Sequence, residues 1–205
     1  MKIVYGTTNK SKIEFMRKRA EPLGIEILSL ADVWGQSPSA WDSPLEIGSS
    51  PLENARIKAR SYHAKLGGLV FAADSGLYID GLEDARQPGI NVRGEGDWMT
   101  DDDAIAHYAA LAKEFGGKMR AQYKNAICLI RADGVMHEHM GDDIASKPFY
   151  LVDKPHEIRK TGFPLDSLSV NIATGKYYYD LENDSEYEDD FHDGFTDFFK
   201  RTLGL

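Results

Sequence analysis

The sequence predicts a single mixed α/β domain over residues 1–205. Helical and extended patterns alternate in the first half, and a long antiparallel hairpin follows them. A chain of 205 residues with 42% hydrophobic residues has enough apolar side chains to bury one core. We find no internal repeat and no low-complexity tract apart from one acidic segment near the C-terminus.

The first half begins with a predicted buried strand at residues 2–6. A helix follows, because its apolar side chains recur at helical spacing, and the segment 25–30 alternates as a second strand. Residues 34–51, rich in Ser, Pro, Gly and Trp, predict a long loop, which usually marks either a functional or a mobile segment. The apolar residues of the predicted helix are Ile13, Met16, Ala20 and Leu23.

A capping box predicts the next helix. Ser50 and Glu53 have the required spacing, and Pro51 takes the first helical position, so a helix should run to about Leu66. Residues 69–73 then predict a buried strand, and Leu77 to Ile79 can continue in an extended conformation.

The second half contains a helix capped by Thr100 to Asp103, a hairpin and a final helix. The hairpin pairs residues 119–132 with 135–140 through an Asp-Gly turn, and the final helix lies near 194–203. The side chains expected to face inward from the capped helix are Ile105, Tyr108, Leu111 and Phe115.

Composition excludes several classes of protein. The net charge is −9, and residues 180–193 contribute eight acids without Lys or Arg, so a duplex nucleic-acid binder is not expected. No apolar run reaches the roughly 20 residues needed to cross a membrane, and the N-terminus has no hydrophobic leader. The single cysteine, Cys128, lies in an apolar run and predicts a buried, inert thiol. We expect a cytoplasmic protein without membrane or nucleic-acid partners.

The segment GTTNKSK, residues 6–12, joins the first strand to its helix. Free backbone N–H groups and the helix dipole point at such a loop, and both attract phosphate. Thr7, Thr8 and Asn9 add polar groups, and Lys10 and Lys12 add charge. The glycine and lysine spacing of a P-loop is absent, so a capped helix start with solvated lysines remains an alternative.

Acidic residues follow at two further places. Glu46 precedes the predicted helix, on which Asn54 and Lys58 share one face because they lie four residues apart. Asp74 opens the sequence Asp-Ser-Gly after a predicted strand, where either a turn or a ligand-binding segment is expected. Glu46 and Asp74 offer the oxygen ligands that magnesium prefers.

Four segments together resemble the inosine triphosphate pyrophosphatase family. They are GTTNKSK, EIGSSPLENARIKA, AADSGLYIDGL and QPGINVRG, in order and register over about the first 95 residues. The resemblance implies magnesium-dependent hydrolysis of a nucleoside triphosphate to the monophosphate and pyrophosphate, with manganese as an alternative metal. It also implies an elongated mixed sheet in two lobes, with a central nucleotide cleft and flanking helices, usually as a homodimer.

The resemblance assigns roles to individual residues. Glu46 and Asp74 would bind the metal, with Asp74 also accepting a proton from water. The substrate would be held by Thr7, Thr8, Asn9, Lys12, Asn54, Lys58 and Ser75, with Arg93 close by. In the base pocket it implies Phe163, Asp166 and His192.

The chain departs from the family pattern at three places. Ala73 replaces the first of two adjacent acids, so one metal ligand is missing. Residues 162–167 keep Phe163 and Asp166 but lose most of a base-pocket motif, and residues 187–193 keep His192 but lack the family's lysine and arginine. We expect phosphate chemistry to be retained and base recognition to be changed.

Three functions are therefore open. The first is a nucleoside triphosphate pyrophosphohydrolase, and the second is a relative that selects another base or a modified nucleotide. In that second case Tyr187 and Asp193 would favour a base that carries amino groups, unless residues 180–193 form a solvated loop. The third is a nucleotide-binding protein without turnover, suggested by Ala73.

His137 and His139 alternate on a strand and predict an ordinary exposed face rather than a metal pair.

Overall fold

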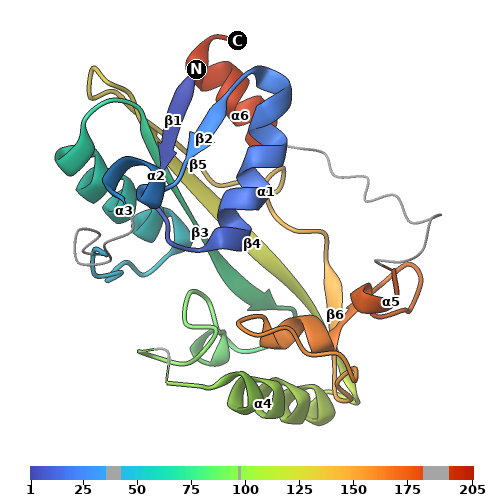
Figure 1. Ribbon diagram of the computed structural model, residues 1–205. Coiled ribbons are helices and arrows are strands. Elements are labelled where there is room, and N and C mark those ends of the chain that lie inside the picture. Colours follow the sequence, from blue (N-terminus) through green and yellow to red (C-terminus); the bar gives the residue numbers. More distant parts are fainter. Residues whose placement is uncertain (36–42, 97, 182–193) are drawn as a thin grey trace. The chain divides into compact units, whose positions relative to one another are not determined.

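The computed structural model describes residues 1–35, 43–96, 98–181 and 194–205 (Figure 1). Within them, seven strands form one mixed sheet in the order β2-β1-β3-β4-β6-β7, with β5 paired to β4. The strands are β1 (Lys2–Tyr5), β2 (Glu26–Leu28), β3 (Val70–Ile79), β4 (Lys118–Ile130), β5 (Met136–His139), β6 (Phe149–Val152) and β7 (Ser169–Asn171). Helices accompany this sheet, which confirms the predicted α/β class.

The helices are α1 (Lys10–Ala20), α2 (Leu30–Trp34), α3 (Pro51–Leu66), α4 (Asp101–Glu114), α5 (Tyr178–Leu181) and α6 (Gly194–Leu203). Short 3-10 helices add η1 (Glu21–Leu23), η3 (Asp84–Arg86) and η4 (Pro164–Leu168). No helix in the described part of the chain is long and apolar enough to span a membrane.

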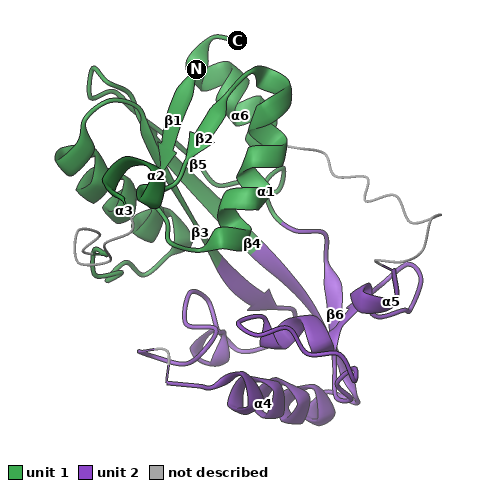
Figure 2. Cartoon of the chain, viewed as in Figure 1, with its two compact units in different colours: residues 1–75, 124–145, 192–205 green, residues 76–123, 146–191 purple. Residues whose placement is uncertain are grey.

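The chain divides into two compact units (Figure 2). Unit 1 comprises residues 1–75, 124–145 and 192–205, and unit 2 comprises residues 76–123 and 146–191. Strands β3 and β4 each contribute residues to both units. The arrangement of a single domain as two lobes around a cleft stays a prediction.

Unit 1 has three layers, because alternate side chains of its strands face opposite helices. On β3, Phe71 and Ala73 join the core cluster that contains α1 and α6 residues. Ala72, between them, packs with Ala55 and Ala59 of α3. β1 pairs in parallel with both β2 and β3, and such strands are usually covered on both faces. Helices α1 and α6 lie side by side in Figure 1.

Aromatic side chains fill the centre of the layer between the unit 1 strands and helix α6. Phe71 stacks on Tyr5, with ring centroids 4.3 Å apart, and meets Phe199 edge to face at 5.3 Å. Phe199 is fully buried. Offset and edge-to-face arrangements are the favoured geometries for aromatic pairs.

Unit 2 buries its apolar side chains under α4 and η4. Tyr108 and Leu111 of α4 and Leu168 of η4 lie in one cluster with residues of β3, β4 and β6. β4 pairs antiparallel with β6, and β6 with β7. This cluster packs η4 against α4.

The Asp-Ser-Gly sequence predicted that the strand would end before Asp74, but strand β3 does not end there. It continues as one strand to Ile79, so Asp74 lies inside a strand and the turn interpretation is wrong. Within unit 2, a Cβ at Gly76 would meet the carbonyl oxygen of Gly89 at 2.9 Å. Leu77 and Gly89 exchange backbone hydrogen bonds here, so the glycine permits the close approach of the next segment.

The structure corrects several element boundaries. β2 ends at Leu28, because Ser29 forms a capping box with Asp32 and starts helix α2; the prediction of a strand to residue 30 was wrong. α1 ends at Ala20, and Leu23 belongs to η1. Phe115 is exposed rather than inward, because α4 ends at Glu114.

Other boundaries also differ in detail. Ser50 caps α3 by accepting from the Glu53 backbone N–H, but the Glu53 carboxylate accepts from Ser49, so the expected reciprocal box is not formed. β4 ends at Ile130, two residues earlier than expected. The hairpin to β5, helix α6 and the burial of Cys128 are confirmed.

We predict that replacing Phe199 with alanine destabilises the protein strongly. The change removes a fully buried ring from between α6 and β3, and comparable truncations cost about 3–5 kcal/mol. Urea unfolding of Phe199→Ala measures the loss. Phe15→Ala is the control, since that ring is 37% exposed and its loss should cost clearly less. Equal unfolding midpoints for the two variants would contradict this packing.

Candidate active site

Lys58 lies at the centre of the candidate site. Its ammonium group, Nζ, is 3.1 Å from Glu46 Oε2 and 3.2 Å from Asp74 Oδ1. The residue is 8% exposed. One buried cation therefore links carboxylates from two segments, the loop before α3 and the middle of β3.

A second lysine approaches the same carboxylate from helix α1. Lys12 Nζ lies 3.5 Å from Asp74 Oδ1. The side chain of Asp74 is 11% exposed, whereas those of Lys12 and Glu46 are 36% and 46% exposed. The cluster is thus closed around Lys58 and Asp74 and open to solvent at Lys12 and Glu46.

The electrostatics keep Asp74 ionised. Burial raises the pKa of its carboxyl, but Lys58 and Lys12 outweigh burial, and Ser75 donates a backbone hydrogen bond, so the pKa lies below its usual value. Burial lowers the pKa of Lys12, and the like charge of Lys58 adds to this, against the opposing effect of Asp74. Burial, with a contribution from the charge of Asp74, raises the pKa of the buried Tyr5.

Asn54 positions the loop that carries Glu46. Its side-chain oxygen accepts a hydrogen bond of 2.8 Å from the backbone N–H of Gly48, and the residue is 2% exposed. A Cβ at Gly48 would lie 2.6 Å from this oxygen, so glycine permits the contact. Asn54 and Lys58 share one buried face of α3, as their spacing predicted, and the predicted contact of Asn54 with substrate stays a prediction.

The segment 6–12 forms the start of α1 as expected. Asn9 is the N-cap, and its side-chain oxygen accepts from the Lys12 backbone N–H at 3.1 Å. Thr7 Oγ1 accepts from the Asn9 N–H at 3.2 Å, and Thr8 is exposed. A role in holding phosphate stays a prediction for Thr7, Thr8 and Asn9, while Lys12 lies within the cluster around Asp74.

The donor set fits a magnesium ion. Two carboxylate oxygens converge on one point, because both lie within 3.2 Å of the Lys58 nitrogen. The described residues contain no group of three or more acidic, His or Cys side chains that could hold a metal. Two carboxylates suit magnesium, which usually completes its shell with water and substrate phosphate. Ala73 is buried in the core and offers no ligand.

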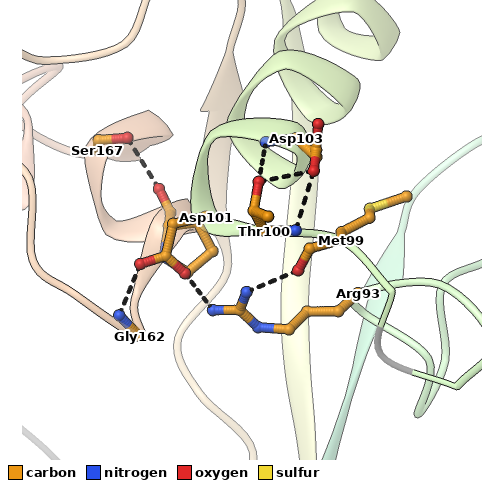
Figure 3. A network of polar contacts seen from close by, with 8 residues as sticks. Arg93, Met99, Thr100, Asp101, Asp103, Gly162 and Ser167 are labelled. Atoms are coloured by element: carbon orange, nitrogen blue, oxygen red, sulfur yellow. Dashed lines mark hydrogen bonds and ion pairs between the residues drawn. The ribbon is translucent and has the colours of Figure 1, made fainter.

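Three predicted site residues belong to unit 2. Arg93 donates to Asp101 Oδ1 at 2.5 Å and to the Met99 carbonyl at 3.1 Å (Figure 3). Phe163 and Asp166 are half-buried at the start of η4, and Lys160 Nζ lies 4.8 Å from the centre of the Phe163 ring.

Other predicted residues lie outside the described part of the chain. These are His192, with Tyr187 and Asp193 of the acidic segment. Among the histidines on β5, His139 bonds to Asp143 at 2.8 Å, and both His137 and His139 are half-buried. The prediction that these two histidines lie on an exposed strand face is therefore only partly correct, because both side chains are half-buried.

Sequence reasoning missed Asp101, which lies at the centre of the unit 2 network. Thr100 and Asp103 form the capping box of α4, and the sequence analysis assigned the whole segment from Thr100 to Asp103 to this cap and gave Asp101 no further role. A second acid inside a capping box is the signal that could have found Asp101, because the cap leaves its carboxylate available for other partners.

We predict that Lys58→Met raises the pKa of Asp74 in the metal-free protein. Lys58 is the strongest of the groups that lower this pKa, and without it only Lys12 and the backbone hydrogen bond from Ser75 oppose the effect of burial. The ¹³C shift of the Asp74 carboxyl, followed against pH, measures the change. Lys10→Met is the control, since it removes an exposed charge from the same segment as Lys12. An unchanged Asp74 titration in Lys58→Met would contradict the cluster.

The lowered pKa of Asp74 in the parent protein has a consequence for the free energy of unfolding. Because the folded-state pKa of Asp74 lies below its unfolded value, Asp74 stabilises the protein above the unfolded pKa, about 3.9. That contribution is lost as the pH falls through the lower folded-state value. Lys58→Met should reduce the contribution and weaken this part of the acid dependence.

Comparisons with known proteins bear on this site. Residues 3–146 match the model of the Ham1 family. A relative from Zymomonas mobilis, named dITP/XTP pyrophosphatase, is 32% identical over 68% of this chain and 65% of its own length. One of the same name from Thermus thermophilus is 32% identical over 88% of this chain and 81% of its own. The match thus spans slightly less than two thirds of the first of these relatives.

Solved structures share the fold. A HAM1 protein from Coxiella burnetii gives a TM-score of 0.71 at 21% identity, covering all of this chain and 98% of the other. The Staphylococcus aureus Ham1 protein gives 0.67 at 19% identity with the same coverage. The family model, the sequence relatives and the shared fold agree with the four sequence segments. The chain belongs to the Ham1 family.

Proposed function

We propose that the protein is a magnesium-dependent nucleoside triphosphate pyrophosphohydrolase. It converts a ribo- or deoxyribonucleoside triphosphate and water to the monophosphate and pyrophosphate. The observation that carries this proposal is the cluster in which Lys58 joins Glu46 and Asp74, with Lys12 beside them. Membership of a family whose relatives are named dITP/XTP pyrophosphatase supports it.

The cluster contains both kinds of group that the reaction needs. Lys12 and Lys58 supply positive charge for a polyanionic substrate and for the pyrophosphate that leaves. Asp74 is ionised before substrate arrives, because its pKa is lowered, and an ionised carboxylate can accept a proton from the attacking water. Its place inside β3 holds this carboxylate rigidly, as positioning for attack at the α-phosphorus requires.

A magnesium ion would be held by Glu46 and Asp74, with manganese as a substitute. Its charge would neutralise phosphate oxygens and lower the pKa of bound water. Lys58 would then turn from the two carboxylates toward the phosphates. We extend the proposal to a homodimer in the cytoplasm that controls the nucleotide pool, on the basis of the family resemblance.

The base is a separate part of the proposal. The relatives' names specify dITP and XTP, whereas the altered segment 162–167 and the acidic segment 180–193 favour a changed preference. Comparing kcat/KM for ITP, dITP and XTP with that for ATP, dATP and CTP identifies the base. If the protein instead binds nucleotides without turnover, no nucleotide of this panel is hydrolysed.

We predict that Asp74→Asn lowers kcat by on the order of 100-fold, because it removes a proton acceptor and a metal ligand together. The amide is isosteric, so the fold should be kept, while the loss of the charge that pairs with Lys58 and Lys12 should lower the melting temperature. Hydrolysis of the best substrate is followed by quantifying monophosphate, pyrophosphate and orthophosphate. Pyrophosphate should be the primary inorganic product. Parent-like turnover in Asp74→Asn, or orthophosphate with a diphosphate as the first products, would refute the proposal.

A further inference from the structure

Three segments of unit 2 meet at the carboxylate of Asp101 (Figure 3). Arg93, from the loop after β3, donates to Oδ1 at 2.5 Å. The backbone N–H of Gly162, from the segment before η4, donates to Oδ2 at 2.8 Å. The carboxylate thus joins two loops that are 69 residues apart in sequence to the first turn of α4.

Helix capping does not account for this arrangement. Thr100 accepts from the Asp103 N–H at 3.2 Å, and the Asp103 carboxylate accepts from the Thr100 N–H at 3.1 Å. The cap of α4 is complete without Asp101. Arg93 is itself held by the Met99 carbonyl at 3.1 Å, so the guanidinium has a fixed position from which to hold Asp101.

Gly162 immediately precedes Phe163. Its φ of +83° lies in the left-handed region, where glycine is favoured. On the other side of Phe163, η4 is anchored in the core by Leu165 and Leu168. The backbone of Phe163 is therefore fixed on both sides, by the bond from Gly162 to Asp101 and by the burial of η4, while its ring stays half-buried.

We propose that Asp101 is a positioning residue for the nucleobase: held by Arg93, it fixes Gly162 and thereby the ring of Phe163, on which the base stacks. The proposal rests on the proposed function, which brings a nucleotide to this family segment. Stacking on an aromatic ring tolerates any base, so Asp101 supports affinity for the base without choosing it. Arg93, which the resemblance placed close to the substrate, then acts through Asp101.

The experiment compares Asp101→Ala with a matched control, Asp102→Ala. Asp102 is the next acid in the first turn of α4 and is exposed, so its removal reproduces the loss of helix-end charge. Asp101→Ala should raise KM for the best nucleoside triphosphate about tenfold, the lower end of what one stacked base contributes, with kcat within about threefold. Inhibition by inorganic tripolyphosphate, which has no base, should be unchanged, and Asp102→Ala should resemble the parent.

A double-mutant cycle with Phe163→Ala separates positioning from a general structural effect. If Asp101 acts through Phe163, then Asp101→Ala has no further effect on KM once the ring is gone. Asp101→Asn keeps an oxygen for the Gly162 N–H and should recover part of the affinity. Additive effects in the cycle, or weaker inhibition by tripolyphosphate in Asp101→Ala, would overturn the proposal.

Gly162→Ala provides a second route should Asp101→Ala fail to fold. A Cβ at Gly162 has nothing within 4 Å, so the change strains the backbone without a clash, and KM should rise as in Asp101→Ala. If the parent hydrolyses no nucleotide, the proposed function fails, and calorimetric binding of nucleotide to the same variants still tests Asp101. A parent that binds no nucleotide refutes both.

Discussion

The site depends on one buried ammonium group shared by two carboxylates. Lys58 can reach Glu46 and Asp74 only because α3 packs closely on the strands of unit 1. Ala55 and Ala59 make this close approach possible, since both are fully buried against Ala72 of β3. The same helix brings Asn54 one turn before Lys58, and Asn54 holds the loop of Glu46 through Gly48. One helix face therefore positions the whole cluster.

This arrangement is better explained by chemistry than by stability. Burying charged groups costs free energy that their mutual attraction often fails to recover, whereas the aromatic and aliphatic clusters of each unit provide apolar burial. A cluster with two cations, a fixed carboxylate and an open side at Lys12 and Glu46 is suited to receive an anion. In unit 2, the ion pair between Arg93 and Asp101 has a structural consequence instead, because the Asp101 carboxylate also holds the backbone N–H of Gly162.

Much of the unit 1 site could be predicted from sequence. The spacing of Asn54 and Lys58 predicted that they share one helix face. The family segments predicted that Lys12, Glu46, Lys58 and Asp74 belong to one site. The extent of β3 could not be predicted, because Asp, Ser and Gly favour turns locally, whereas the pairing of Leu77 with Gly89 keeps this segment extended. Tertiary contacts overrode local preference.

The features that the sequence did not predict have two physical causes. Helix α2 is five residues long and depends on the capping box from Ser29, which is a weak signal beside a predicted strand. The bond from Gly162 to Asp101 joins segments 61 residues apart, and no periodicity or propensity carries such information. Long-range polar contacts become visible only once the fold is known, and here they connect the predicted Arg93 and Phe163.

The most direct test of the central claim is binding of Mn²⁺, followed by electron paramagnetic resonance. The titration uses a non-hydrolysable nucleoside triphosphate analogue with the parent, Glu46→Gln, Asp74→Asn and a control, Glu14→Gln, an exposed acid of α1. Our account predicts that the parent and Glu14→Gln bind Mn²⁺ equally, and that the other two variants bind it at least about tenfold more weakly, because each loses one of two carboxylate ligands. Equal affinity in all four proteins would contradict it.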